Sequence, residues 1–212
     1  MIIKKSLEGF NIMKKIKILA LGDSYTIGED VPQNESWPFL LKRNLEERNF
    51  SVVLKVVAKT GWTTDELDLA IEREKLGKNE YDLVFLLIGV NNQYRGYCID
   101  KYRNEFRRLL LKAKSYSVNN SVFILSIPDW SSTPFASEND KARISEEIDA
   151  FNRENFEISE SEGALYLSIT GISRRSADDK RYTASDGLHP SGYQYEKWVE
   201  KIMLKIDSSA LL

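Results

Sequence analysis

The sequence predicts an α/β fold, a three-layer α/β/α sandwich with a five-stranded parallel sheet, of the flavodoxin-like kind. Five apolar runs alternate with five segments of helical periodicity along the 212 residues, and this alternation is typical of successive β-α-β units. Right-handed crossovers between parallel strands then place helices on both faces of the sheet. No internal repeat, low-complexity segment or linker interrupts the pattern.

The predicted strands are short apolar runs, several of them rich in β-branched residues. The run at 81–88 is the most apolar, which places it at the centre of the sheet, where both faces are covered. The five strands are predicted at residues 16–21, 52–57, 81–88, 122–127 and 164–169.

The predicted helices carry an apolar stripe on one face and capping residues at their ends. Ser36 is a candidate cap for the first of them. Thr63 and Glu66 have the spacing of a capping box, and Gly77 follows the end of the same helix, where glycine is common. The five helices are predicted at residues 36–48, 64–75, 100–116, 139–159 and 192–206.

Composition narrows the range of functions. The net charge of −2 gives no electrostatic basis for binding nucleic acid, whose partners carry a basic excess. A single cysteine, Cys98, excludes an internal disulfide framework and a multi-cysteine metal site. The only histidine, His189, excludes most catalytic zinc sites, which need several imidazoles. These two counts therefore exclude the metal sites that depend on several cysteines or several histidines.

The chain is predicted to form one domain over residues 14–212. Residues 1–13 are expected to be an N-terminal arm, or an upstream start before Met13. No run approaches the ~20 apolar residues that span a bilayer, so no integral membrane segment is expected. No signal-peptide pattern is present either, which favours a cytoplasmic protein. The sequence leaves the oligomeric state open.

Residues with functional side chains follow the predicted strands. The carboxyl ends of parallel strands lie on one edge of a sheet, where ligands bind in α/β folds. Five separate regions therefore converge at this edge. They carry Ser24, Gly61, Asn91, Trp130, and the pair Asp186 and His189.

These residue types suit acyl transfer. A serine hydroxyl needs a base to become a nucleophile, and the imidazole of His189 can accept its proton. Asp186, three residues earlier, can fix the imidazole tautomer. The oxyanion of a tetrahedral intermediate needs fixed donors. The backbone amides of Ser24 and Gly61 and the side-chain amide of Asn91 are the candidates.

The motifs resemble those of the SGNH (GDSL) hydrolase superfamily. They are Gly22-Asp23-Ser24, Gly61, Gly89-Val90-Asn91 and Asp186-x-x-His189, in the family's order, and the resemblance covers about residues 14 to 206. It implies a flavodoxin-like fold, hydrolysis of esters or thioesters, and no metal cofactor. Two residues depart from the usual pattern. Tyr25 replaces a leucine, and Asn92 replaces an aspartate that we expect to act as structural support.

The leading hypothesis is thus a serine hydrolase that cleaves small-molecule carboxylic esters through an acyl-enzyme on Ser24, as a small esterase or a lysophospholipase-like acylhydrolase. Trp62, Tyr94 and Trp130 are candidates to bind the substrate, as are two further aromatic residues, Tyr97 and Phe135; each could equally pack in the core or a loop.

Three alternatives remain open at this point. A deacetylase of acetylated carbohydrates would use the same residues. A metal-dependent phosphoesterase could use Asp23, Asn91 and His189, although such sites usually need more carboxylates and imidazoles, and Asp23 is more simply an acceptor for loop amides. The third alternative is a non-catalytic binding module, but the sequence contains no G-x-G-x-x-G pattern that would support it. Three arginines, Arg174, Arg175 and Arg181, could attract an anionic substrate, but a solvated loop is the simpler interpretation.

Overall fold

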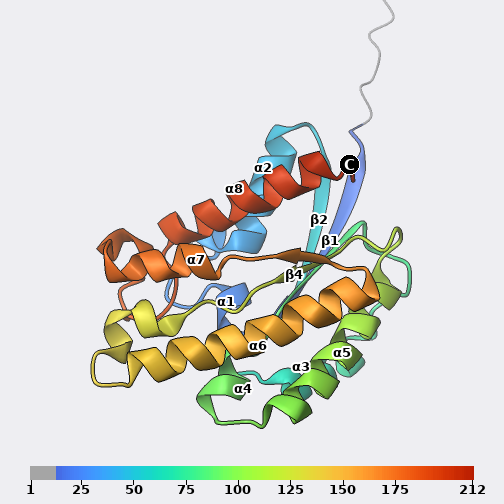
Figure 1. Ribbon diagram of the computed structural model, residues 1–212. Helices are drawn as coiled ribbons and strands as arrows, with labels where there is room; N and C mark the ends of the chain where they lie inside the picture. Colours follow the sequence, from blue (N-terminus) through green and yellow to red (C-terminus); the bar gives the residue numbers. More distant parts are fainter. Residues whose placement is uncertain (1–12) are drawn as a thin grey trace, which may run out of the picture.

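The computed structural model describes residues 13–212. The expected arm, apart from Met13, lies outside the described residues. Five parallel strands form one sheet in the order β2-β1-β3-β4-β5 (Figure 1). The strands are β1 (Lys15–Gly22), β2 (Ser51–Ala58), β3 (Leu83–Leu87), β4 (Val122–Leu125) and β5 (Leu165–Leu167). The predicted five-stranded parallel sheet is confirmed.

Helices cover both faces of the sheet, as predicted. On one face α2 (Trp37–Glu47) packs against α8 (Gly192–Ser208). On the other face α5 (Ile99–Tyr116) lies between α3 (Thr64–Glu74) and α6 (Lys141–Glu162) (Figure 1). This two-sided arrangement follows from right-handed crossovers in a sheet whose strand order reverses. Within residues 13–212, no helix has the combined length and apolarity needed to cross a membrane.

The core lies on both sides of β3. All five residues of that strand are buried, which agrees with the central position predicted from its apolar sequence. Phe85 stacks on Phe123 of β4 with ring centroids 4.8 Å apart and meets the edge of Trp37 at 5.3 Å. Helix α3 begins with the predicted capping box of Thr63 and Glu66.

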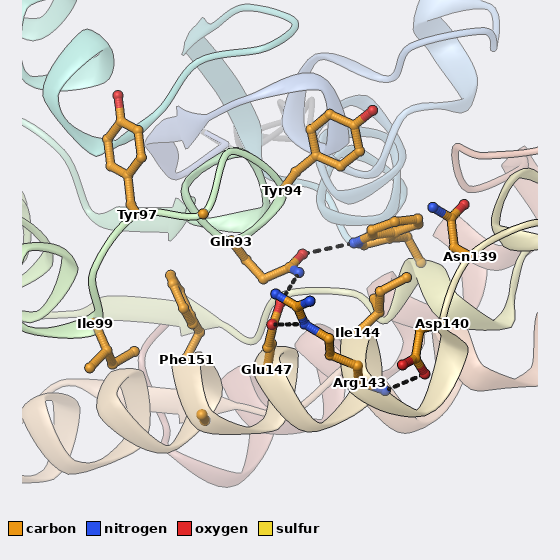
Figure 2. Close-up of a pocket in the computed structure, with 13 residues that line it drawn as sticks. Gln93, Tyr94, Tyr97, Ile99, Asn139, Asp140, Arg143, Ile144, Glu147 and Phe151 are labelled. Carbon is orange, nitrogen blue, oxygen red and sulfur yellow. Dashed lines mark hydrogen bonds and ion pairs between the residues drawn. The ribbon is translucent and has the colours of Figure 1, made fainter.

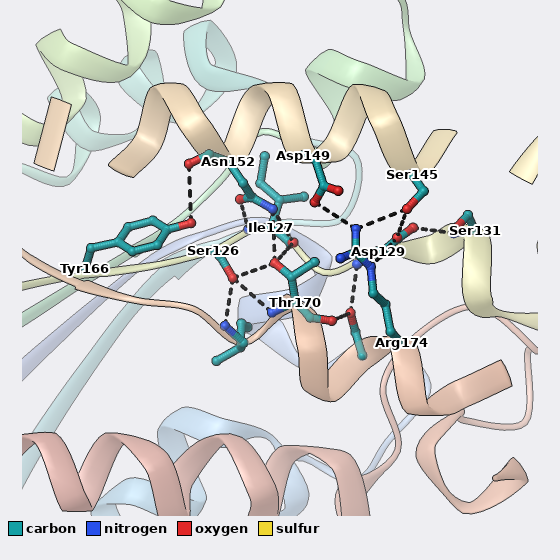
Figure 3. A network of polar contacts seen from close by, with 12 residues as sticks. Ser126, Ile127, Asp129, Ser131, Ser145, Asp149, Asn152, Tyr166, Thr170 and Arg174 are labelled. Carbon is teal, nitrogen blue, oxygen red and sulfur yellow. Dashed lines mark hydrogen bonds and ion pairs between the residues drawn. The ribbon is translucent and has the colours of Figure 1, made fainter. Parts of the chain in front are cut away.

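The last strands are shorter than predicted because side chains replace the neighbouring strand as hydrogen-bond partners. Strand β4 ends at Leu125, and the Ser126 hydroxyl accepts hydrogen bonds from the backbone N–H groups of Ile169 and Thr170. The Asn152 side chain then binds both the N–H and the carbonyl of Ile127 (Figure 3). An apolar pattern cannot reveal this exchange, because Ile127 and Ile169 remain buried.

Three short helices were not predicted from the sequence. They are α1 (Ser24–Ile27), α4 (Val90–Tyr94) and α7 (Thr170–Ser173), each too short to show a helical period. Five 3₁₀ turns were also not predicted: η1 (Gln33–Glu35), η2 (Trp130–Ser132), η3 (Pro134–Ala136), η4 (Arg174–Ala177) and η5 (Lys180–Tyr182).

The strand order creates a crevice at the end of β1. From β1 the chain goes to β2 on one side and later to β3 on the other, so this is the point where ligands bind in such sheets. Gly22, the last residue of β1, pairs with Ala58 of β2 and with Leu87 of β3. The three strands therefore end at the same level, and the loops that follow them start side by side.

Candidate active site

Ser24, His189 and Asp186 lie in one hydrogen-bonded row. The Ser24 Oγ is 3.0 Å from His189 Nε2, and His189 Nδ1 is 2.5 Å from Asp186 Oδ2. Ser24 and His189 are 165 residues apart in the sequence. Ser24 follows β1, and the long connection between β5 and α8 brings His189 to it.

Asp186 is held in place from several directions. Its Oδ1 accepts the backbone N–H groups of Leu188 at 2.8 Å and His189 at 3.0 Å. Its own N–H donates to Asp30 Oδ2 at 2.8 Å. Partial burial raises the pKa of Asp186, but the hydrogen bonds from His189 and Leu188 outweigh it, so the pKa lies below its ordinary value. Asp186 is therefore a carboxylate at neutral pH. No sequence pattern had indicated this role of Asp30.

The turn that carries Ser24 is shaped by the two residues before it. A side chain at Gly22 would collide with the Leu87 carbonyl and the Thr26 side chain, so only glycine fits this close approach. Asp23 caps α1: its Oδ1 accepts the Tyr25 N–H at 3.0 Å, and its carbonyl accepts those of Thr26 and Ile27. The prediction that Asp23 holds the loop amides is confirmed.

Asp23 is also an unusual carboxyl group. It is 1% exposed, and Oδ2 has no hydrogen-bond partner among the described residues. Burial raises its pKa from 3.8 to about 7, because a low-dielectric environment disfavours the charged form. The Tyr25 N–H lowers the pKa, but by less than burial raises it.

The candidate oxyanion donors follow β1, β2 and β3, which end at the same level. Gly61 has φ +83°, a left-handed conformation that favours glycine, and Arg95 Nη2 fixes its peptide by donating to the Gly61 carbonyl at 2.6 Å. Asn91 Nδ2 donates to the Trp62 carbonyl at 2.9 Å, which leaves its second N–H available. Within residues 13–212, the backbone N–H groups of Ser24 and Gly61 make none of the hydrogen bonds of the fold.

Asn92 supports this region from behind. It is fully buried; its Oδ1 accepts the Thr64 N–H at 3.1 Å, and its Nδ2 donates to Thr64 Oγ1 at 2.7 Å. The Thr64 hydroxyl donates its single proton to Glu105 Oε2. The side chain at position 92 must therefore donate a hydrogen bond to Thr64 Oγ1. An asparagine meets this need and an ionised aspartate does not. The departure at Asn92 thus has a local structural reason.

Two of the three predicted substrate-binding residues line a cavity of about 570 Å³ beside α4 and α6 (Figure 2). Tyr94 and Trp130 meet edge to face at 5.6 Å. Gln93 accepts the Trp130 Nε1–H at 2.9 Å and donates to Glu147 at 2.7 Å. Trp62 does not line this cavity.

Aromatic contacts connect the cavity with the His189 loop. The Trp130 ring meets Phe135 at 6.0 Å, and the Phe135 N–H donates to the Gly187 carbonyl at 2.9 Å. Gly187 lies between Asp186 and His189. Tyr94 and Phe135 are 60% and 46% exposed, so both side chains are open to solvent between the cavity and the His189 loop.

Two of the three arginines before the His189 motif pair with nearby carboxylates. Arg174 binds the buried Asp129 at 2.9 Å and Asp149 at 2.7 Å (Figure 3), and Arg181 binds Asp179. Burial raises the pKa of Asp129, but hydrogen bonds from Ser131, Ser145 and Arg174 bring it below its ordinary value. This network, which the sequence did not reveal, fixes the loop of Trp130. Within the described part of the chain, no three His, Cys, Asp or Glu residues gather as a metal site would require.

Comparison with known proteins places the chain in one family. Residues 20–197 match the GDSL-like lipase/acylhydrolase family. An arylesterase of Vibrio mimicus is 29% identical over 112 residues, and this match spans 53% of this chain and 56% of the arylesterase. The chain thus matches about half the length of that curated relative.

Solved structures share the fold. The acetylxylan esterase Axe2 of Geobacillus stearothermophilus superposes with a TM-score of 0.72 at 17% identity, covering 92% of this chain and 95% of Axe2. TesA gives 0.68 at 18% identity, covering 92% and 99%. The esterase EstA of a Pseudoalteromonas species gives 0.66 at 21% identity, covering 92% and 98%. The resemblance predicted from the four sequence motifs is confirmed: this chain belongs to the GDSL-like lipase/acylhydrolase family.

Proposed function

We propose that this chain is a serine hydrolase that cleaves carboxylic esters through an acyl-enzyme on Ser24. The observation that carries the proposal is the continuous hydrogen-bonded row from Ser24 Oγ through His189 to Asp186. Such a row activates a hydroxyl that is otherwise a weak nucleophile. Membership of the GDSL-like family supports the same class of reaction.

The proton positions follow from the charge on Asp186. A carboxylate only accepts hydrogen bonds, so His189 carries its proton on Nδ1 and presents a lone pair on Nε2 to the Ser24 hydroxyl. Ser24 Oγ attacks the ester carbonyl as its proton passes to Nε2. The imidazolium then protonates the leaving alcohol as the C–O bond breaks. In the second half, His189 takes a proton from water as that water attacks the acyl-enzyme. The imidazolium then returns this proton to Ser24 Oγ as the acyl C–O bond breaks and the acid leaves.

Three donors are proposed to stabilise the oxyanion: the backbone N–H groups of Ser24 and Gly61 and the second N–H of Asn91. Preorganised donors stabilise the developing charge without reorganising during the reaction. The contact of Asn91 with Trp62 supports this role because it orients the amide before substrate arrives. Arg95 holds the Gly61 carbonyl, which lies in the peptide unit next to the proposed Gly61 donor.

Replacing Asn91 with alanine tests the oxyanion assignment. We expect kcat to fall about 10²- to 10³-fold with little change in KM, since the donor acts on charge that develops in the transition state. Asn44→Ala is the matched control, because this amide on α2 donates only to the Leu40 carbonyl of its own helix. A kcat within about threefold of the wild type would remove Asn91 from the proposed oxyanion hole.

The pH dependence of acylation tests the base. The rate of inactivation by a fluorophosphonate is expected to rise with pH, because only neutral imidazole accepts the serine proton. Burial also raises the pKa of Asp23 to about 7, so the profile is measured in Asp23→Asn as well. Persistence of the rise in that variant assigns it to His189; a flat profile in the wild type contradicts the role of His189.

The apolar part of the ester is proposed to lie against Tyr94 and Trp130, which line the cavity beside α4. Trp62 stays a weaker prediction, since its carbonyl binds Asn91 and its side chain lies outside that cavity. A cytoplasmic location and the absence of nucleic-acid partners stay predictions from the sequence.

A panel of substrates tests the reaction class. It contains activated alkyl esters of increasing chain length, a thioester and acetylated sugars, with Ser24→Ala as the blank. We expect turnover of alkyl esters above that blank. Preference for acetylated sugars would instead favour the carbohydrate deacetylase. No turnover of any ester by the folded wild type would refute the proposed function.

A further inference from the structure

The side chain next to the proposed nucleophile packs against the proposed base. The rings of Tyr25 and His189 have centroids 5.6 Å apart and planes inclined by 60°, an edge-to-face contact. Tyr25 is only 3% exposed. Its N–H is tied to Asp23 Oδ1 at 3.0 Å, and it lies in the same turn of α1 as Ser24. The Tyr25 ring is therefore fixed relative to Ser24 Oγ.

His189 needs a contact of this kind. Its two side-chain hydrogen bonds, to Asp186 and to Ser24, involve the two ring nitrogens. They do not by themselves stop the imidazole from turning about its Cβ–Cγ bond. That turn moves Nε2 and its lone pair out of line with Oγ. A ring packed against the imidazole opposes this motion, and edge-to-face aromatic pairs are favourable beyond the area they bury.

The hydroxyl of Tyr25, unlike its ring, does not contribute to holding His189. Within residues 13–212 it makes no hydrogen bond, whereas the hydroxyl of the buried Tyr102 bonds to Ile88 and Asn155. Burial, followed by the nearby carboxylates of Asp23, Asp129 and Asp186, raises the pKa of Tyr25 above its ordinary value. The hydroxyl thus stays neutral, and the contact with His189 belongs to the ring.

We propose that Tyr25 is a positioning residue whose aromatic ring holds the imidazole of His189 in line with Ser24. This inference rests on the proposed hydrolase mechanism and extends it to a residue outside the row of three. The ring itself touches no reacting atom, so its loss lowers the rate of proton transfer and leaves substrate binding unchanged.

Two substitutions separate the ring from the hydroxyl. Tyr25→Phe keeps the ring, and Tyr25→Leu removes it while leaving an apolar side chain in the buried site. With an activated short-chain ester, we expect Tyr25→Phe to stay within about twofold of the wild-type kcat. We expect Tyr25→Leu to lower kcat about tenfold at unchanged KM. Circular dichroism and the thermal midpoint establish that each variant is folded.

Nuclear magnetic resonance adds a readout that does not depend on the leucine variant folding. Because His189 is the only histidine, its ring protons are assigned without ambiguity. Nuclear Overhauser effects between these protons and the ring of residue 25 are expected in the wild type and in Tyr25→Phe. Their absence from the folded wild type would overturn the proposal.

The kinetic results also test whether Tyr25 positions His189. A folded Tyr25→Leu with wild-type kcat, or with a raised KM alone, would overturn the inference. So would a loss in Tyr25→Phe as large as in Tyr25→Leu, because the hydroxyl would then be the active part. Full activity of Ser24→Ala is a different failure: it would refute the proposed function, whatever Tyr25 does.

Discussion

Replacing Ser24 with alanine is expected to lower kcat/KM for an activated ester by a factor of about 10⁴ or more. The change removes the nucleophilic oxygen, which lies 3.0 Å from His189 Nε2, so no acyl-enzyme forms. His189→Ala should cost about as much, since residues that act as a unit lose their effect together. Initial rates across the ester panel measure both variants.

The controls for this experiment come from the same chain. Ser208→Ala removes a hydroxyl at the end of α8 that donates only to the Lys205 carbonyl, and it should keep wild-type rates. Circular dichroism and thermal unfolding establish that Ser24→Ala and His189→Ala are folded. Folded Ser24→Ala with more than about one tenth of wild-type activity would contradict the mechanism.

Replacing Asp23 with asparagine is expected to change how stability depends on pH. Burial raises the pKa of Asp23 from 3.8 to about 7 in the folded protein, so the folded state holds its proton more tightly than the unfolded state. The stability gained from this proton is complete below pH 3.8 and is lost as pH rises through about 7. Asparagine keeps the acceptor for the Tyr25 N–H and has no proton to lose.

The expected result is a change with pH in the stability difference between Asp23→Asn and the wild type. Between pH 5 and 8 the free energy of unfolding of Asp23→Asn, relative to the wild type, should rise by about 2.5 kcal/mol. Urea unfolding at several pH values measures it, with Asp178→Asn as a control at an exposed carboxylate. A relative stability that stays constant across this range would show that Asp23 titrates alike in the folded and unfolded states.

Much of the site could be predicted because backbone topology controls it. Ser24, Gly61 and Asn91 follow strands whose ends a parallel sheet must bring to one edge. The level ends of β1, β2 and β3 then place their loops side by side. The spacing of Asp186 and His189 allowed one turn to present both side chains, and the observed hydrogen bonds within that turn agree.

The rest depends on contacts between side chains that are distant in the sequence. Asp129 and Arg174 are 45 residues apart, and Asn92 and Thr64 are 28 apart; no periodicity links either pair. The contact of Tyr25 with His189 depends on the rotamers of both rings. For Trp62, the sequence predicted a position after β2. It could not predict on which side of the loop the ring would lie.

Covalent labelling tests the central claim most directly. The wild type is treated with a fluorophosphonate, digested, and examined by mass spectrometry. We expect one adduct, on Ser24, formed more slowly or not at all in His189→Ala and absent from Ser24→Ala. An adduct on any other residue, or equal labelling of Ser24→Ala, would contradict Ser24 as the nucleophile.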